Sequence, residues 1–180
     1  MSKSRLIARI ALCTALIAVS AQISFPLPTG VPVTLQTFAI AFAAAFLGAK
    51  YGVVSVLCYL LLGACGVPVF AGFKGGFGAL VGVTGGYLTG FLPMALLVGL
   101  AKNAKLPFAV LLCAAGLAAC HFLGVLQFHF VAGTPLLAAF VKASAPYLVK
   151  DAVSVLGAVL LGKKLSSALT PKGEDAATPA

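Results

Sequence analysis

Two charged side chains stand apart in a hydrocarbon-rich sequence and could bind a small polar molecule. Lys74 lies in the stretch PVFAGFKGGFGALVG, residues 68–82, among glycines and phenylalanines. Asp151 is the only acidic residue before Glu174. A lysine ammonium binds anions such as carboxylates, and an aspartate accepts hydrogen bonds from N–H groups. Because apolar walls with a few polar groups are typical of small-molecule pockets, this pair predicts a ligand site.

Hydroxyl and amide side chains are predicted to gather around this pair. They occur where three predicted helices begin, and all three ends are expected at one face of a membrane. The residues are Thr34, Gln36, Thr84, Tyr87 and Tyr147. Each alone could simply bond to a neighbouring helix, as polar side chains in membranes often do. Their convergence on one face favours their interpretation as part of a binding site.

The loop around Lys74 has the composition of a pocket wall rather than of a solvated turn. Phe70 and Phe73 flank the cation, and three glycines adjoin it. Glycine permits backbone conformations closed to other residues and lets a backbone approach a ligand closely. We therefore predict that this loop contributes to the pocket. An ordinary interfacial lysine in a flexible loop is the alternative.

Asp151 has two alternative interpretations. An ionised group at membrane depth is costly and needs a partner or a wet cavity. It therefore either binds a ligand or pairs internally with Lys74 or Lys142. Lys150 directly precedes Asp151 and lies about 100° away around a helix, so the two are not expected to pair. We predict that Lys150 extends outward to the interface and is a weaker ligand candidate.

Sequence motifs for catalysis are not found in the chain. It has no HExxH, no Walker A motif, no paired carboxylates and no credible Ser/His/Asp arrangement. His121 and His129 have no ligand-type partner four residues away, so no metal site and no cofactor are expected. The sequence predicts a binding protein rather than an enzyme. A transporter of this kind would need another source of energy or would act passively.

The composition identifies the solvent of this chain as lipid. Of its 180 residues, 62% are hydrophobic and only 8% are charged, whereas soluble domains carry about 25% charged residues. With water excluded, helices are the default because each must satisfy its own backbone. We predict an all-α integral membrane protein with six transmembrane helices, near residues 6–24, 33–49, 52–67, 83–101, 107–130 and 146–164. They form one domain, 1–165, followed by a polar and disordered cytoplasmic tail, 166–180.

The basic residues predict the orientation of these helices. The net charge of +9 would suggest nucleic acid in a soluble protein, but these cations lie at the ends of apolar runs. Nine of them fall on the side of the termini and three on the other side or within the membrane. This positive-inside bias predicts cytoplasmic N and C termini, a multi-pass protein of the cell membrane, and no nucleic-acid partner. Residues 1–21 imitate a signal peptide, but the apolar run is long enough to span and is expected to be retained.

Small residues recur at the spacing that lets membrane helices approach closely. Gly78, Gly82, Gly86 and Gly90 follow one another every four residues, and a pair of alanines, Ala11 and Ala15, repeats the spacing in the first helix. Small residues are common in membrane helices, so the alanine pair alone has little weight.

Four short segments together resemble a known family. They are VPVTLQ at 31–36, GVPVF at 66–70, TGGYL at 84–88 and APYLVKD at 145–151. The combination is similar to the biotin-specific S components, the BioY family, of energy-coupling-factor (ECF) transporters. The resemblance covers roughly residues 5–165 and is weakest in the fifth helix.

The resemblance implies a six-helix subunit that binds biotin from outside with high affinity. It also implies docking to a transmembrane T component and two ATP-binding-cassette (ABC) ATPases, with Ala11 and Ala15 at the contact with the T component. The substrate-binding residues would be Lys74, Asp151, Gln36, Tyr87, Thr34, Thr84, Phe70, Phe73 and Tyr147.

The sequence departs from the family pattern at three positions. Ser154 occupies a position where the family often has lysine, Val83 replaces a usual proline, and Lys74 stands where arginine is frequent. Lysine keeps the charge of arginine but loses its planar, two-pronged geometry. Biotin remains the best match, with another small vitamin or a non-transporting scaffold as alternatives. Whether Lys74 or Asp151 meets the carboxylate end of the ligand stays open.

Overall fold

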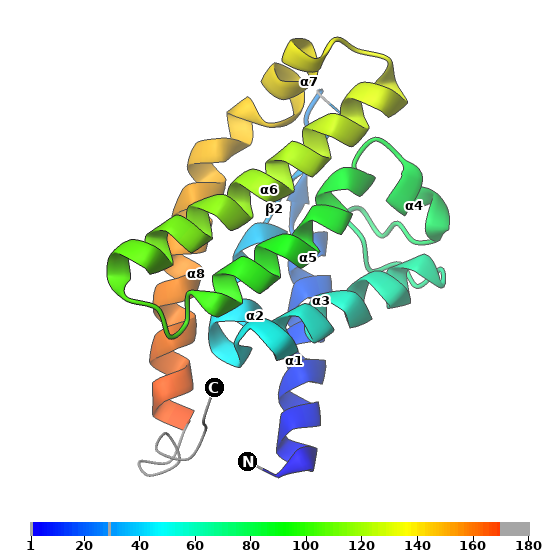
Figure 1. Cartoon of the computed structure of the whole chain (residues 1–180). Helices are drawn as coiled ribbons and strands as arrows, with labels where there is room; N and C mark the ends of the chain where they lie inside the picture. Colours follow the sequence, from blue (N-terminus) through cyan, green and yellow to red (C-terminus); the bar gives the residue numbers. More distant parts are fainter. Residues whose placement is uncertain (1, 29, 170–180) are drawn as a thin grey trace.

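A bundle of apolar helices makes up the structure, a computed structural model that describes residues 2–28 and 30–169 (Figure 1). A short antiparallel pair of two-residue strands separates the first two helices. The elements in order are α1 (Lys3–Gln22), β1 (Ser24–Phe25), β2 (Val33–Thr34), α2 (Gln36–Leu47), α3 (Ala49–Ala64), α4 (Phe77–Val81), α5 (Gly85–Leu100), α6 (Leu106–Ala132), α7 (Leu136–Ala143), a 3₁₀ turn (Ala145–Tyr147) and α8 (Leu148–Leu169).

Three stretches are long and apolar enough to cross a membrane: Lys3–Gln22, Leu106–Ala132 and Leu136–Leu169. Three further apolar helices, α2, α3 and α5, have 12 to 16 residues. The prediction of a mostly helical membrane protein is confirmed. At the end of α2, Lys102 Nζ donates to the backbone oxygen of Phe46 at 2.9 Å and so satisfies a backbone group that lipid could not.

Helix α2 forms the centre of the bundle and carries the predicted site residue Gln36 at its start, next to Thr37, which was not predicted. Ten of its twelve residues are buried, on every side of the helix. A helix that is apolar all round is expected to be surrounded by protein, and α1, α3, α5 and α8 all pack against it. The first turn of α2, with Gln36 and Thr37, is thereby fixed in the interior.

Helices α5 and α6 pack closely because glycines remove side chains from their contact (Figure 1). A Cβ added at Gly86 would lie 2.2 Å from the backbone oxygen of Leu123, and one at Gly90 would lie 2.9 Å from Cα of Cys120. The predicted close packing is therefore confirmed at these two glycines. At Gly78 an added Cβ would meet nothing within 4 Å, so the pattern overstates the contact there.

Several boundaries differ from the prediction. The glycine-rich loop contains a short helix, α4, and Pro146 lies in the 3₁₀ turn that precedes α8. Helix α8 continues to Leu169, so the predicted tail, 166–180, begins inside a helix and otherwise lies outside the described residues. The start of α1 and the end of α8 lie at the same end of the bundle (Figure 1), where Arg9 Nη2 donates to the backbone oxygen of Leu169 at 3.2 Å.

Candidate ligand pocket

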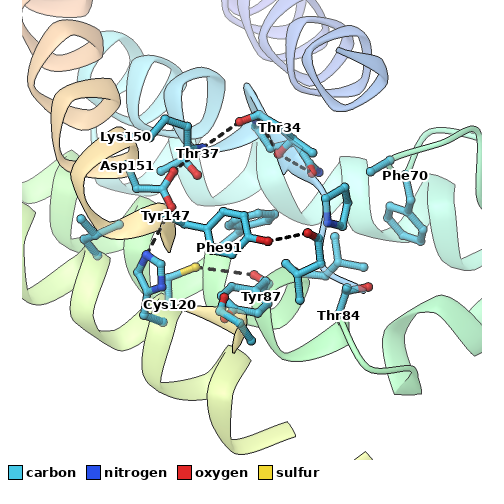
Figure 2. Close-up of a pocket in the computed structure, with 18 of the residues that line it drawn as sticks. Thr34, Thr37, Phe70, Thr84, Tyr87, Phe91, Cys120, Tyr147, Lys150 and Asp151 are labelled. Carbon is cyan, nitrogen blue, oxygen red and sulfur yellow. Dashed lines mark hydrogen bonds and ion pairs between the residues drawn. The ribbon is translucent and has the colours of Figure 1, made fainter. Parts of the chain in front are cut away.

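A cavity of about 90 Å³ lies between the start of α2 and the facing parts of α5, α6 and α8 (Figure 2). The segment before α2, the loop after α3 and the 3₁₀ turn complete its wall. Eight of the nine predicted substrate-binding residues line it: Thr34, Gln36, Phe70, Lys74, Thr84, Tyr87, Tyr147 and Asp151. The structure thus brings together residues that are more than a hundred positions apart in the sequence.

Asp151 is the most buried charged group of this cavity, with 6% of the residue exposed. Its Oδ2 lies 3.2 Å from Nε2 of His121, and its Oδ1 is paired with the ammonium of Lys150. The hydroxyl of Thr37 also hydrogen-bonds to the carboxylate. These partners compensate the loss of water around the charge and fix the direction in which its remaining lone pairs point.

The prediction for Lys150 was wrong. Its ammonium turns back over the helix to pair with Asp151, and it donates a 2.8 Å hydrogen bond to the backbone oxygen of Thr34 (Figure 2). The four-carbon stem of lysine is long and flexible enough to overcome the 100° between adjacent Cα–Cβ directions. The predicted internal partners of Asp151, Lys74 and Lys142, are replaced by Lys150 and His121.

Lys74 lines the same cavity from the loop after α3, whose Phe70 lies across the pocket from Asp151 (Figure 2), and it is exposed. Its ammonium forms no ion pair with any described residue. The backbone of its loop is well defined: Phe70 and Lys74 exchange two hydrogen bonds, of 2.9 and 3.2 Å. A cation that is held near a cavity without an internal counter-charge is available for an anionic ligand.

Gln22, at the end of α1, ties this loop to the bundle. Its amide nitrogen donates to the backbone oxygens of Val69 and Phe70, at 3.0 and 3.2 Å. Its amide oxygen accepts a 3.0 Å bond from the backbone N–H of Phe73. This side chain from another helix therefore helps to hold the segment that carries Lys74, together with the buried ring of Phe70.

The aromatic wall of the cavity differs from the prediction at Phe73. This residue has a positive φ of 55°, is 72% exposed and does not line the cavity. Phe70 is only 2% exposed and packs edge-on against Tyr59, with ring centroids 5.4 Å apart. The tight turn between Phe70 and Lys74 leaves Phe70 inside and Phe73 outside, which composition alone could not distinguish. Phe91 of α5 also lines the wall and was not predicted.

The hydroxyl and amide groups at the cavity mostly bond to other parts of the protein. Thr34 Oγ1 donates to Gln36 Oε1 at 3.1 Å, and Gln36 Nε2 donates to the hydroxyl of Tyr59 at 2.7 Å. The Tyr147 hydroxyl donates to the backbone oxygen of Val31 (Figure 2). These bonds orient the side chains before any ligand arrives, which lowers the entropic cost of binding.

Sequence reasoning missed His121 and Ser144. His121 Nδ1 lies 2.8 Å from Ser144 Oγ, and both residues are buried. The Tyr87 hydroxyl lies 2.9 Å from the same Ser144 oxygen and donates to the backbone oxygen of Ala143. An ionisable residue inside an apolar helix is a signal of function, and His121 could have been selected on that basis. Ser144 follows no pattern in the sequence.

The two alanines predicted for partner docking do not line this cavity. Ala11 and Ala15 are exposed on α1 and line an apolar groove of about 750 Å³ between α1 and α3. Its other walls are aliphatic side chains, Thr14 and two cysteines. The groove is almost entirely apolar and suits the packing of another helix.

Apolar helices around an internal pocket with opposite charges on its two sides define a membrane protein that binds a small polar ligand. The sequence profile of the BioY family matches residues 1–171, and the chain belongs to this family. It is 44% identical to the biotin transporter BioY of Thermotoga maritima over 154 residues, which cover 84% of this chain and 90% of the relative. It is 36% identical to a probable biotin transporter BioY of Pyrococcus horikoshii, over 91% of this chain and 97% of the relative.

The fold is also that of a solved structure. The chain superimposes on the S-component for biotin from an ECF-type ABC transporter, a crystal structure at 2.1 Å, with a TM-score of 0.82. The superposition covers 93% of this chain and 95% of the other, at 25% identity.

Proposed function

We propose that this protein is the biotin-binding S component of an ECF transporter, a transport subunit rather than an enzyme. The observation that carries the proposal is the polarity of the pocket. Asp151, held by Lys150 and His121, lines the pocket on α8, and Lys74, whose cation has no ion-pair partner among the described residues, lines it from the loop after α3. Biotin has the matching polarity, because its ureido ring offers N–H donors at one end and its valerate chain ends in a carboxylate.

The two charges differ in the partners that they have within the protein, and this difference suggests the direction in which biotin binds. Asp151 has its charge compensated within the protein, so it can accept hydrogen bonds from neutral ureido N–H groups without needing a ligand cation. Lys74 has no internal counter-charge among the described residues, so it meets the carboxylate. Phe70, Phe91 and Tyr87 would enclose the apolar ring and chain between them.

The size of the cavity supports a loop that moves. About 90 Å³ is well below the 300–1,000 Å³ that is usual for pockets of drug-sized ligands. Lys74 itself is exposed, and its loop is held to the bundle by the hydrogen bonds of Gln22 and by the buried ring of Phe70. We therefore infer that this loop opens to admit biotin and closes over it.

The topology and the partners complete the proposal. Six helices cross the membrane, both termini face the cytoplasm, and the pocket opens to the outside. The groove between α1 and α3, with Ala11 and Ala15, takes a helix of the T component. Two ABC ATPases bound to that component supply the energy for release of biotin inside.

Calorimetry on the purified protein in detergent tests the ligand. We expect biotin to bind, and thiamine and riboflavin not to bind. Lys74→Ala and Asp151→Asn should each weaken biotin binding, whereas Lys142→Ala is a matched control, because Lys142 is also exposed and does not line the cavity. A wild-type protein that does not bind biotin contradicts the function. Biotin binding that both pocket variants retain contradicts the site.

Co-purification with the T component and the ATPases tests the docking groove. Ala11→Trp and Ala15→Trp should prevent assembly, since a large ring would fill the groove, and should leave biotin binding within about twofold. Leu12→Trp is the control, because Leu12 is exposed on the same helix and does not line the groove. Assembly that survives both alanine substitutions would place the contact elsewhere.

A further inference from the structure

A chain of four polar side chains connects α5, α6 and α8 at the wall of the ligand pocket, and three of the four are buried whereas Tyr87 is half-buried. It runs from Tyr87 through Ser144 and His121 to Asp151. We propose that His121 is a positioning residue that holds the Asp151 carboxylate for the ligand, and that Ser144 selects the ring tautomer that allows it. The proposal rests on the proposed function for its affinity readout, but the tautomer itself can be measured without a ligand.

If the ring of His121 is neutral, its contacts indicate which nitrogen carries the proton. A neutral imidazole has one N–H donor and one acceptor nitrogen. Nε2 faces Asp151 Oδ2 at 3.2 Å, and only an N–H can make that contact favourable. Nδ1 must then accept, and its neighbour at 2.8 Å is the hydroxyl of Ser144. Ser144 can donate there because Tyr87 gives its own hydrogen to the Ala143 backbone oxygen.

The other surroundings of His121 offer few groups that could replace its Nε2–H or the hydroxyl of Ser144. Its other side borders an apolar crevice of about 640 Å³ between α6 and α7–α8, walled by side chains such as Phe122, Leu126 and Phe140. Hydrocarbon on that side cannot provide an N–H to the carboxylate. Ser144 is fully buried, so bulk water does not readily replace its hydroxyl either.

A histidine that only filled space would show a different pattern. His121 does pack edge-on against Tyr87, with centroids 5.8 Å apart, and that contact alone requires no particular tautomer. The polar contacts at both ring nitrogens do require one, and they end on the single carboxylate of the pocket. The geometry therefore links Ser144, which does not line the cavity, to the ligand through His121.

Removal of the Ser144 hydroxyl is expected to cause a binding defect that depends on pH. In Ser144→Ala the neutral ring is free to place its proton on Nδ1, and the lone pair of Nε2 would then face the carboxylate. Acid should reverse this defect, because an imidazolium has N–H groups on both nitrogens. The other titratable groups that line the pocket with His121 are Lys74 from the loop after α3, Tyr87 from α5, Cys120 from α6, Tyr147 from the 3₁₀ turn, and Lys150 and Asp151 from α8. Imidazole is the group among these types that ordinarily titrates between about pH 5.5 and 7.5.

Biotin affinity measured by calorimetry at about pH 7.5 and 5.5 is the first experiment. We expect His121→Leu to weaken binding by about tenfold or more at both pH values, since a hydrogen bond to a charged group is lost. His121→Gln, whose amide nitrogen can replace Nε2–H, should recover part of that loss. Ser144→Ala should weaken binding at the higher pH and regain most of it at the lower. His129→Gln is the matched control, because His129 is the other histidine of α6 and does not line the cavity.

Nitrogen-15 spectra of histidine-labelled protein in detergent are the second experiment and need no ligand. His129→Gln assigns the two rings, and wild-type His121 should show the Nε2–H form at about pH 7.5. An Nδ1–H ring overturns the proposal even if biotin binds normally. Wild-type affinity in His121→Leu, or a Ser144→Ala defect that acid does not relieve, overturns it as well. If the wild type does not bind biotin, the proposed function fails, and the spectra alone test the predicted tautomer of His121.

Discussion

The two charged sides of the pocket are built in different ways. Asp151 is buried in a long helix, and Lys150, His121 and Thr37 all contact its carboxylate. Lys74 is exposed in a loop whose positions are fixed by backbone bonds and by Gln22. A site that must recognise a ligand needs a preorganised part, and a site that must also open needs a part whose movement is not costly. In the proposed function, α8 therefore recognises the ligand and the loop controls access to it.

The largest effect is expected on the buried side. Asp151→Asn leaves the ammonium of Lys150 without its counter-charge and removes an acceptor for the ligand. Binding of biotin should fall by more than about 100-fold, and stability by about 3 kcal/mol, near the low end for a broken buried pair because the Lys150 side chain is 30% exposed. Calorimetry and detergent melting curves measure the two quantities.

A double variant separates the two roles of this pair. Asp151→Asn combined with Lys150→Met should regain most of the stability, since no charge is then left uncompensated, but none of the affinity. A double variant that binds biotin as the wild type does would show that the buried carboxylate is not the recognition group.

On the loop side, Lys74→Ala should change affinity without changing stability. We expect biotin binding to weaken by about 10- to 100-fold, the range for loss of one charge-assisted contact, while the melting temperature stays within about 1 °C, because the ammonium has no ion pair among the described residues. Lys74→Arg should retain most of the affinity. Equal losses of stability at Lys74 and Asp151 would remove the distinction between the two sides.

A smaller effect is expected where the loop is tied to the bundle. Gln22→Leu removes three hydrogen bonds to Val69, Phe70 and Phe73 and touches no ligand. The closed loop should become less favourable, so biotin should dissociate about three- to tenfold faster with little change in the association rate. Stopped-flow kinetics measure both rates. Slower dissociation would mean that Gln22 holds the loop open instead.

The smallest effect should be at Phe73. Phe73→Ala removes a side chain that is 72% exposed and outside the cavity wall, so the biotin Kd should change by less than about twofold. Phe70→Ala is the matched comparison at the buried position and should weaken binding clearly. The ratio of the two dissociation constants tests whether Phe70 rather than Phe73 contacts the ligand. A large effect at Phe73 would place it over the ligand in the closed loop.

Much of this molecule could be predicted from its sequence. The low charge content forces helices in lipid, and breaks at proline and glycine place them to within a few residues, since lipid leaves the backbone few alternatives. Lys74 and Asp151 could be selected because an isolated charge in apolar surroundings needs a reason. Gly86 and Gly90 predicted a close helix contact, since this contact depends only on the size and spacing of the residues.

The tertiary structure alone decided how the selected residues meet. The direction of Lys150 depends on side-chain torsions and on the backbone oxygen of Thr34, which lies 116 positions away in the chain. Phe70 and Phe73 are equivalent in composition, and only the loop conformation turns one inward. His121 and Ser144 become a pair because α6 and the end of α7 pack together. Sequence determines which groups need partners, because that depends on the chemistry of each residue, whereas the fold determines which partners they find, because that depends on distances between segments far apart in the chain.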